Sequence, residues 1–531
     1  MEQNLNKKKN SDIEIGLIIV SVILLAAFIV LMVVKPQSTL DGISGFFWKI
    51  ISVFGPIFEV FTFATFIIAL YLGFGKYGKV RLGDCKPEYT TFSYVSMMLL
   101  ASLASAALYW SFTEWAFYYE APGLNMKAEG LRALESSLGY QFFHWGMTNQ
   151  AMYTIMGVAI AYGVYIRKVQ SFQTSAVCSA MMGEKVKGKS AIGKVIDFCV
   201  IFGILGGLSS SLGLAVPLAT GGLNKLFGME ATPVVQIGVI VVIALVYTFT
   251  SYLGTKRGMK VISDGAAILC VLFLVYVLFT GPTVFILRNI VNSFGYMIQD
   301  LPRMSLFTDP VKNSGFAENW TIYFEAFYLN YLAMMGIFVA KISKGRTIRQ
   351  VAIATILGIS AGGWFLFGVD GSFSIKTFLD GKVDVPGLAN SGIGDAAIYE
   401  ILQVLPLGAT LLPVVILLLI VGFVAPSMDS ASLALSQTVT KSGEPKMVMR
   451  IFWCVLLAII PMCIILSGAG FTPIKYLAII ISVPFLIIVV GMEIGLFKWL
   501  HYDNRSGLHA RNIALQEEEQ QKEFMEESKG E

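Results

Sequence analysis

The chain has 531 residues, of which 56% are hydrophobic and only 14% are charged, and its mean hydropathy is +0.70. Soluble domains carry about a quarter charged residues, so the composition excludes an ordinary soluble protein and places most of the chain in a lipid bilayer. The formal net charge of +4 excludes little by itself.

Apolar runs of membrane length follow one another from Ile15 to Leu500. A bilayer-crossing helix needs roughly 20 apolar residues, so the pattern predicts an all-α integral membrane protein with about twelve transmembrane helices. The first run is too long for the hydrophobic region of a signal peptide, and we expect it to be retained. The predicted spans are 14–34, 48–74, 92–118, 140–166, 193–218, 233–253, 260–281, 320–341, 348–368, 400–435, 448–468 and 473–500.

Positive charges gather before the first span and in alternate loops. Lysines and arginines cluster at 7–9, 76–81, 167–194, 256–257, 341–349 and 441–450. The positive-inside rule therefore predicts that both termini are cytoplasmic, which requires an even number of spans. We expect the membrane to be the plasma (inner) membrane.

Two segments differ from the spans in character. Residues 282–303 are amphipathic and carry Arg288, so we expect a helix that lies along the outer face. After Leu500 the tail is acidic and poor in apolar residues, which is typical of a solvated helix or a disordered segment.

Five ionisable residues lie inside predicted spans: Glu114, His144, Lys260, Glu325 and Asp429. On insertion scales a charge at a helix centre costs about 2.5–3.5 kcal/mol, so such residues are functional candidates by default. They fall in five different spans, which makes them candidates for one interior cavity. Each also has a structural reading, in which it pairs with a neighbouring helix.

Glu325 sits in the run NWTIYFEAFYLNYLAMMGIF, residues 319–338, among aromatic residues. At about 100° per residue, one stripe of this helix consists of Phe324, Tyr328, Tyr331 and Met335. Aromatic faces attract cations by about 0.5–2 kcal/mol each, and a carboxylate adds a formal negative charge. The pattern favours a site for a cationic or zwitterionic amine, with a structural carboxylate as the alternative.

A second aromatic patch spans SAALYWSFTEWAFYY (105–119) and YQFFHWGMTNQAMYT (140–154). Gly146 interrupts the latter, so we predict irregular backbone there, which is tolerated at membrane depth only beside a cavity or protein. His144 is a candidate proton relay or a packed, hydrogen-bonded side chain. In VGFVAPSMDSASLALSQT (421–438), Pro426 predicts a broken helix of the kind that builds transporter sites.

Lys260 begins the seventh predicted span. Its ammonium either reaches the interface, pairs with Asp264 four residues on, or occupies the place where a transporter would bind sodium. No P-loop, HExxH, GxSxG or dinucleotide fingerprint is present. The six cysteines show no metal-binding spacing. We therefore expect no enzyme activity, no cofactor, no metal and no nucleic-acid partner, and a secondary transporter as the simplest function.

The stretch WTIYFEAFYLNYLAMMGIFVAKISKGRT (320–347) resembles the signature span of the betaine/carnitine/choline transporter family. LPRMSLFTDP (301–310), FHWG (143–146) and MDSAS (428–432) are also similar to that family. The resemblance runs from about Ile15 to Leu500, and its ISKGRT end is specific.

The resemblance implies two leading helices followed by two inverted five-helix repeats, assembled as a homotrimer. The implied divisions are 1–91, the N-terminus and leading helices; 92–281, the first repeat; 282–319, a connector; 320–500, the second repeat; and 501–531, the tail. It also implies an aromatic box at the midplane for a small zwitterionic substrate. Carried over by position, that box consists of Phe327, Tyr328, Tyr331, Trp145 and Phe117.

The chain departs from the family pattern at Glu325, Phe327 and Tyr328, where tryptophans are usual, so an N–H-bearing amine such as sarcosine or dimethylglycine is a further candidate substrate. Lys260 falls where sodium-independent carnitine/butyrobetaine exchangers have an arginine, and Met335 matches their site methionine. The resemblance therefore favours sodium-independent exchange or facilitated transport. The alternatives are a sodium- or proton-coupled importer of an osmoprotectant and a membrane sensor on the same scaffold.

Overall fold

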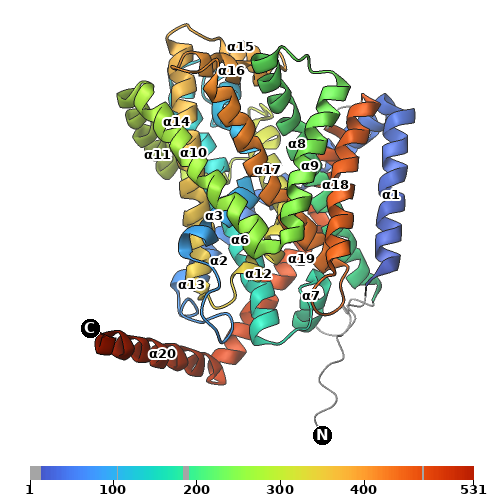
Figure 1. The fold of residues 1–531 in the computed structure, drawn as a ribbon, viewed down its shortest axis with the longest axis vertical. Coiled ribbons are helices and arrows are strands. Elements are labelled where there is room, and N and C mark those ends of the chain that lie inside the picture. Colours follow the sequence, from blue (N-terminus) through green and yellow to red (C-terminus); the bar gives the residue numbers. More distant parts are fainter. Residues whose placement is uncertain (1–12, 104–105, 183–189, 469–471, 531) are drawn as a thin grey trace.

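The computed structural model describes residues 13–103, 106–182, 190–468 and 472–530. These residues form a bundle of long helices, and the start of helix α1 (Ile15–Val34) and helix α20 (Leu508–Gly530) lie toward the same end of it (Figure 1). The only β pairings within them are two isolated bridges. The all-α membrane fold predicted from the sequence is confirmed. Lys7–Lys9 and the lysines at 185, 187 and 189 lie outside the described residues.

The first half of the bundle consists of α1 (Ile15–Val34), α2 (Pro36–Phe74), α3 (Thr91–Leu103), α4 (Ala106–Glu120), α5 (Leu131–His144), α6 (Met147–Ala161), η1 (Tyr162–Ile166), α7 (Thr174–Met182), α8 (Ala191–Phe227), α9 (Pro233–Gly254), η3 (Thr255–Met259) and α10 (Lys260–Thr280). The segments labelled η are π-helical turns.

The second half consists of α11 (Thr283–Ser305), η4 (Ala317–Thr321), α12 (Ile322–Ile342), α13 (Ile348–Ala352), η5 (Ile353–Ile359), α14 (Ser360–Leu379), α15 (Val385–Asn390), α16 (Gly394–Gln403), α17 (Leu411–Thr438), α18 (Met447–Ser467), α19 (Thr472–Arg505) and α20. Helices α15 and α16 lie at the end of the bundle opposite the termini (Figure 1).

Helix ends follow local sequence signals. Thr232 caps α9 by accepting a hydrogen bond from the Val235 N–H, and Pro233 occupies the first helical position. Gly228 ends α8 with φ +67°, a left-handed conformation that glycine adopts without steric cost. Such signals set where spans stop, whereas packing decides which faces are buried.

Within the described residues, nine helices are long and apolar enough to cross a membrane, and the pair α3–α4, bent by 60°, makes a tenth. The run Pro233–Thr280 counts once but contains two predicted spans, α9 and α10, each about 30 Å long. Helices α5 and α6, at 14 and 15 residues, are each too short to count, although together with η1 they contain most of the predicted fourth span, 140–166.

Two predictions about the tenth span are wrong. It begins at Leu411 and not near residue 400, because residues up to Gln403 belong to the separate helix α16. Helix α17 also runs unbroken through Pro426. The hydroxyl of Ser427 lies 3.0 Å from the Phe423 carbonyl one turn earlier, so side-chain hydrogen bonding continues along the helix beside the proline.

The two segments outside the spans are both helical. Residues 283–305 form α11, which packs against α5 and α14 with Ile286 and Met297 buried and Val291 exposed. The acidic tail forms α20, which docks on the loop after α2. There the Arg81 N–H donates to Asn512 (2.8 Å), and the Arg81 guanidinium pairs with Glu519 (2.5 Å).

Helix α12 lies at the centre of the bundle, packed against α2, α6, α8, α17 and α19. It approaches α6 closely because Gly336 has no side chain, since a Cβ there would lie 2.1 Å from Met156 Cγ. Almost every residue from Ile322 to Ile342 is therefore buried. The aromatic stripe read from the sequence thus meets other helices on all sides, and only the contacts show which ring faces a cavity.

Candidate functional site

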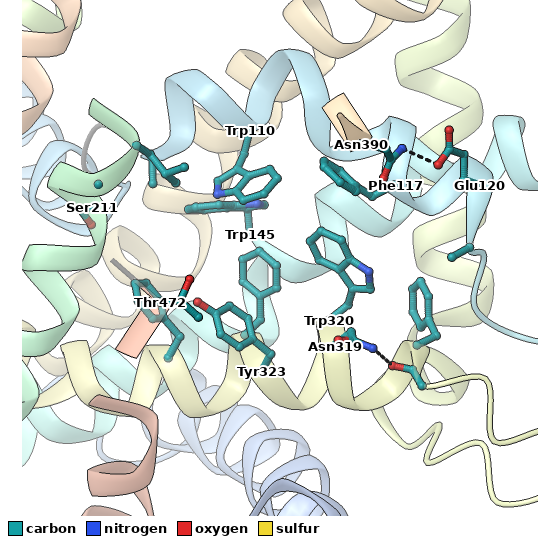
Figure 2. A pocket seen from close by; sticks show the side chains of 18 of the residues that line it. Trp110, Phe117, Glu120, Trp145, Ser211, Asn319, Trp320, Tyr323, Asn390 and Thr472 are labelled. Atoms are coloured by element: carbon teal, nitrogen blue, oxygen red, sulfur yellow. Dashed lines mark hydrogen bonds between the residues drawn. The ribbon is translucent and has the colours of Figure 1, made fainter. Parts of the chain in front are cut away.

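A cavity of about 630 Å³ lies between α4, α8, α12 and α15. Its volume falls within the range of small-molecule sites, about 300–1,000 Å³. Figure 2 shows Trp110, Phe117, Trp145 and Trp320 directed toward the same open space. Further lining residues are Glu120, Ser211, Asn319, Tyr323, Phe324, Phe327, Asn390 and Thr472.

Two helices supply most of the aromatic walls. On α4, Trp110 and Phe117 are seven residues apart and so share one face. Opposite them, Trp320 meets Trp110 edge to face, with ring centroids 6.0 Å apart, and lies 5.6 Å from Phe117. Tyr323 stacks on Phe327 one turn further along α12, at 6.0 Å. The rings brace one another and leave π faces for a bound cation.

Glu114 holds the indole of Trp145. Its carboxylate is fully buried and accepts a hydrogen bond from Trp145 Nε1 at 2.7 Å. The Tyr118 hydroxyl donates to the same carboxylate. Both donors are buried, so the carboxylate of Glu114 is fixed by α4 and by the residue that follows α5. The ring of Trp145 is thereby held at the cavity wall by a buried carboxyl group.

His144 extends this network. Its Nδ1 lies 2.7 Å from the Tyr118 hydroxyl, and its Nε2 lies 3.1 Å from the Thr321 hydroxyl. Because Tyr118 donates to Glu114, its oxygen is left to accept from Nδ1–H, and Nε2 then accepts from Thr321. A neutral imidazole satisfies every partner. His144 therefore links Glu114 to the start of α12, and the hydrogen-bonding reading of this residue agrees with the geometry.

The backbone breaks between α5 and α6, as predicted from Gly146. That glycine is extended, with φ −101° and ψ −158°. Two side chains satisfy the carbonyls that the break frees: Asn149 Nδ2 donates to the His144 oxygen at 2.8 Å, and Gln150 Nε2 donates to the Trp145 oxygen at 3.3 Å. Irregular backbone at this depth is stable because these polar groups are paired.

Behind Trp145 and Phe327 lies a second, inner space of only about 10 Å³. Tyr328 and Tyr331 line it, and they are tied down: Gln150 donates to the Tyr328 hydroxyl at 3.0 Å, and the Tyr331 and Ser211 hydroxyls lie 2.5 Å apart. Such a volume holds one water at most. In this conformation the inner part of the predicted box is closed.

The predicted box residues therefore divide into two groups. Phe117 lines the large cavity alone, Trp145 and Phe327 stand between the two spaces and line both, and Tyr328 and Tyr331 line only the inner space. Met335 is fully buried one turn beyond Tyr331 and, among the described residues, belongs to the lining of neither space.

Glu325 points elsewhere. It is 2% exposed and faces α2, where Glu59 and Thr62 are its polar neighbours. Glu325 is not one of the described residues that line the large cavity or the inner space. The carboxylate that touches a cavity ring is Glu114.

Lys260 and Asp429 are also paired away from the cavity. The Lys260 ammonium lies 2.8 Å from Asp264, which also accepts a hydrogen bond from Ser93 on α3 at 2.8 Å. This matches the i, i+4 pairing among the readings of Lys260. Asp429 forms a buried ion pair with Arg450 of α18, at 2.5 Å. The five ionisable residues therefore do not converge on one cavity, although Glu114 and His144 share a network.

Sequence reasoning missed Trp110, Trp320 and Tyr323 as site residues. A signal was present: Trp110 and Phe117 are seven residues apart, and Trp320, Tyr323 and Phe327 follow the i, i+3, i+7 spacing of one helix face. The stripe chosen from the sequence was the neighbouring one, and the periodicity of α12 alone does not distinguish the two.

Two known transporters are similar in sequence over most of the chain. A carnitine transporter of Acinetobacter baumannii is 35% identical over 456 residues, covering 85% of this chain and 82% of the relative. The uncharacterized transporter YeaV of Escherichia coli is 35% identical over 444 residues, covering 82% and 91%.

Solved structures align more distantly. A Na+-coupled sialic acid symporter aligns with TM-score 0.46 and 13% identity over 82% of this chain and 85% of the other. A manganese transporter of Eremococcus coleocola aligns with TM-score 0.44 and 9% identity over 82% and 87%. Neither likeness bears on substrate or ion coupling.

The family match covers nearly all of the chain. Residues 16–505 match the betaine/carnitine/choline family transporters, and this range contains every helix that lines the cavity. The chain is therefore a member of the betaine/carnitine/choline transporter family, a secondary transporter and not an enzyme.

Proposed function

We propose that the protein carries a small zwitterion with a quaternary or N-methylated ammonium group, and that the ammonium binds among Trp110, Trp145 and Trp320. The observation that carries the proposal is the Trp145 indole, held at the cavity wall by a 2.7 Å hydrogen bond to buried Glu114. Several π faces and a nearby carboxylate together favour a positive charge and disfavour an uncharged ligand of the same shape.

We further propose that transport is sodium-independent exchange or facilitated transport. The resemblance places the hydroxyls of sodium-coupled members in the tenth span. Here the Ser427 hydroxyl lies 3.0 Å from the Leu100 carbonyl of α3 and 3.0 Å from the Phe423 carbonyl, so its proton is already engaged within the protein. The homotrimer remains a prediction from the family resemblance, and the cytoplasmic position of both termini remains a prediction from the positive-inside rule.

The test is uptake into proteoliposomes with a competition panel of carnitine, choline, glycine betaine, dimethylglycine and sarcosine. We expect the methylated compounds to compete and uptake to survive replacement of sodium by potassium. Strong sodium dependence would support the alternative, a sodium-coupled importer. A panel in which no ammonium compound competes would contradict the proposed substrate class.

A further inference from the structure

Helices α2 and α12 run side by side in parallel, and their contact holds two acidic residues. Gly55 makes room for Ile322, since a Cβ at Gly55 would lie 2.6 Å from Ile322 Cδ1. About one turn further along both helices, Glu59 of α2 meets Glu325 of α12. These side chains are 1% and 2% exposed. The two carboxyl groups are therefore buried together at a close helix contact.

Three polar atoms at this contact have no hydrogen-bond partner in the part of the chain that the structure describes. Glu59 Oε1, Thr62 Oγ1 and Glu325 Oε2 are buried without a hydrogen-bond partner among the described residues. Neither glutamate takes part in a salt bridge recorded within that part of the chain. Glu59 interacts electrostatically with Glu318 of η4 and with Arg303 of α11. It also interacts electrostatically with Glu325. Glu59 and Glu325 are therefore the two carboxyl groups of the contact itself, and Glu318 and Arg303 are the further charged groups around Glu59.

We propose that Glu59 and Glu325 form a proton-binding site, in which the two carboxyl groups hold a proton between them and Thr62 donates to the remaining charge. Two adjacent carboxylates out of reach of water cannot both stay ionised, because each raises the cost of charging the other. A proton taken up from water relieves this cost with no other ligand.

A metal ion fits the contact less well. Hard cations such as calcium take six or more oxygen ligands, whereas the contact offers two carboxyl groups and a hydroxyl. Among the described residues, no group of three or more His, Cys, Asp or Glu side chains is arranged to hold a metal. Because α12 also carries Phe327, the charge of the site acts on a helix that lines the cavity. The proton site is independent of which ammonium compound is carried.

The first test uses infrared spectroscopy of the intact protein in lipid nanodiscs, without substrate. At neutral pH we expect a protonated-carboxyl band. Either Glu59→Gln or Glu325→Gln should shift the band, and the double variant should remove that component. Glu493→Gln is the matched control: Glu493 is a buried carboxyl group on α19, and its loss should leave the component in place. An unchanged spectrum in the double variant, or loss of the band on adding sodium, would overturn the proposal.

The second test measures the pH dependence of thermal unfolding and does not depend on the infrared spectra of the variants. A proton held in the folded protein and released on unfolding makes the folded state less stable as pH rises. Thermal unfolding of the unmodified protein should therefore move to lower temperature between mildly acidic and alkaline pH. The decline should be smaller in Glu59→Gln/Glu325→Gln than in Glu493→Gln, and equal declines would contradict the site. If either glutamine prevents folding, Glu59→Asp and Glu325→Asp keep the acid and should restore the pH dependence.

Discussion

Two buried carboxylates beside aromatic residues behave differently in this protein. At the junction of α4 and α5, Glu114 accepts hydrogen bonds from Trp145 and Tyr118 and so touches the cavity wall. At the contact of α2 and α12, Glu325 keeps an oxygen without a partner among the described residues and faces Glu59. The comparison shows that the donors a carboxylate meets in space decide its role, and that aromatic neighbours in sequence do not.

The largest expected effect separates these two residues directly. Glu114→Gln replaces an acceptor by an amide and leaves a buried donor unpaired, which costs about 1–3 kcal/mol. Substrate affinity, measured by calorimetry on the purified protein, should fall by roughly ten- to a hundredfold. The matched variant Glu325→Gln should change affinity at neutral pH by less than about twofold, because its carboxyl group is outside the cavity lining. A larger loss for Glu325→Gln would reverse the comparison.

The next effect concerns the ring that Glu114 holds. Trp145→Ala should weaken binding by about 1–2 kcal/mol if the indole contacts the ammonium. A double-mutant cycle of Glu114→Gln with Trp145→Phe should show coupling of about 0.5–3 kcal/mol, as expected for side chains in direct contact. Additive losses would mean that Glu114 acts on the substrate without acting through Trp145.

A smaller effect compares the open cavity with the closed inner space. Tyr331→Phe removes the hydroxyl that lies 2.5 Å from Ser211 and should cost about 0.5–1.5 kcal/mol of stability. Thermal unfolding measures that cost. Trp320→Ala should instead lower affinity with little loss of stability, because Trp320 is only partly buried at the cavity. If Tyr331→Phe lowers affinity more than Trp320→Ala does, the substrate binds in the inner space.

The smallest effect is expected at Lys260. Its pairing with Asp264 is partly exposed, and such pairs contribute about 0–1 kcal/mol. Lys260→Ala should leave uptake within about twofold and should create no sodium dependence. Sodium-dependent uptake in this variant alone would restore the role that the family resemblance implies for Lys260.

The Glu325→Trp variant addresses the hypothesis formed from the sequence. If Glu325 selected N–H-bearing amines, tryptophan would shift preference toward fully methylated ones. The position of Glu325 against α2 leads us to expect no shift in a competition assay between sarcosine and glycine betaine. A clear shift would place Glu325 at the substrate after all.

Much of the fold was predictable because helix periods and span lengths are local properties. The break at Gly146 followed from one residue that interrupts an apolar run, whereas Trp145 was expected at the site only because the family resemblance placed it there. The periodicity of α12 gave its faces but not the helix that each face meets, so it did not distinguish Glu325, which faces α2, from Trp320, which lines the cavity. The parallel contact between Gly55 and Ile322, which turns Glu325 toward α2, is a property of tertiary packing.

Pro426 shows the same limit from the other side. A proline removes one backbone hydrogen bond and predicts a bend, yet α17 continues through it. The buried Ser427 hydroxyl of α17 lies near the Phe423 carbonyl of the same helix and near the Leu100 carbonyl of α3, and these contacts stabilise the helix beside the proline. Local sequence signals therefore predicted the helix break at Gly146 correctly, but they also predicted a break at Pro426 where the helix is continuous.

The most direct test of the central claim compares two ligands of equal shape and different charge. Carnitine and its isostere, in which a quaternary carbon replaces the nitrogen, are titrated against the unmodified protein and Trp145→Ala. If the aromatic cavity recognises a positive charge, carnitine should bind at least about tenfold more tightly, since several cation–π contacts of about 0.5–2 kcal/mol act together. That ratio should shrink in Trp145→Ala. Equal affinity of the two ligands for the unmodified protein would contradict the claim.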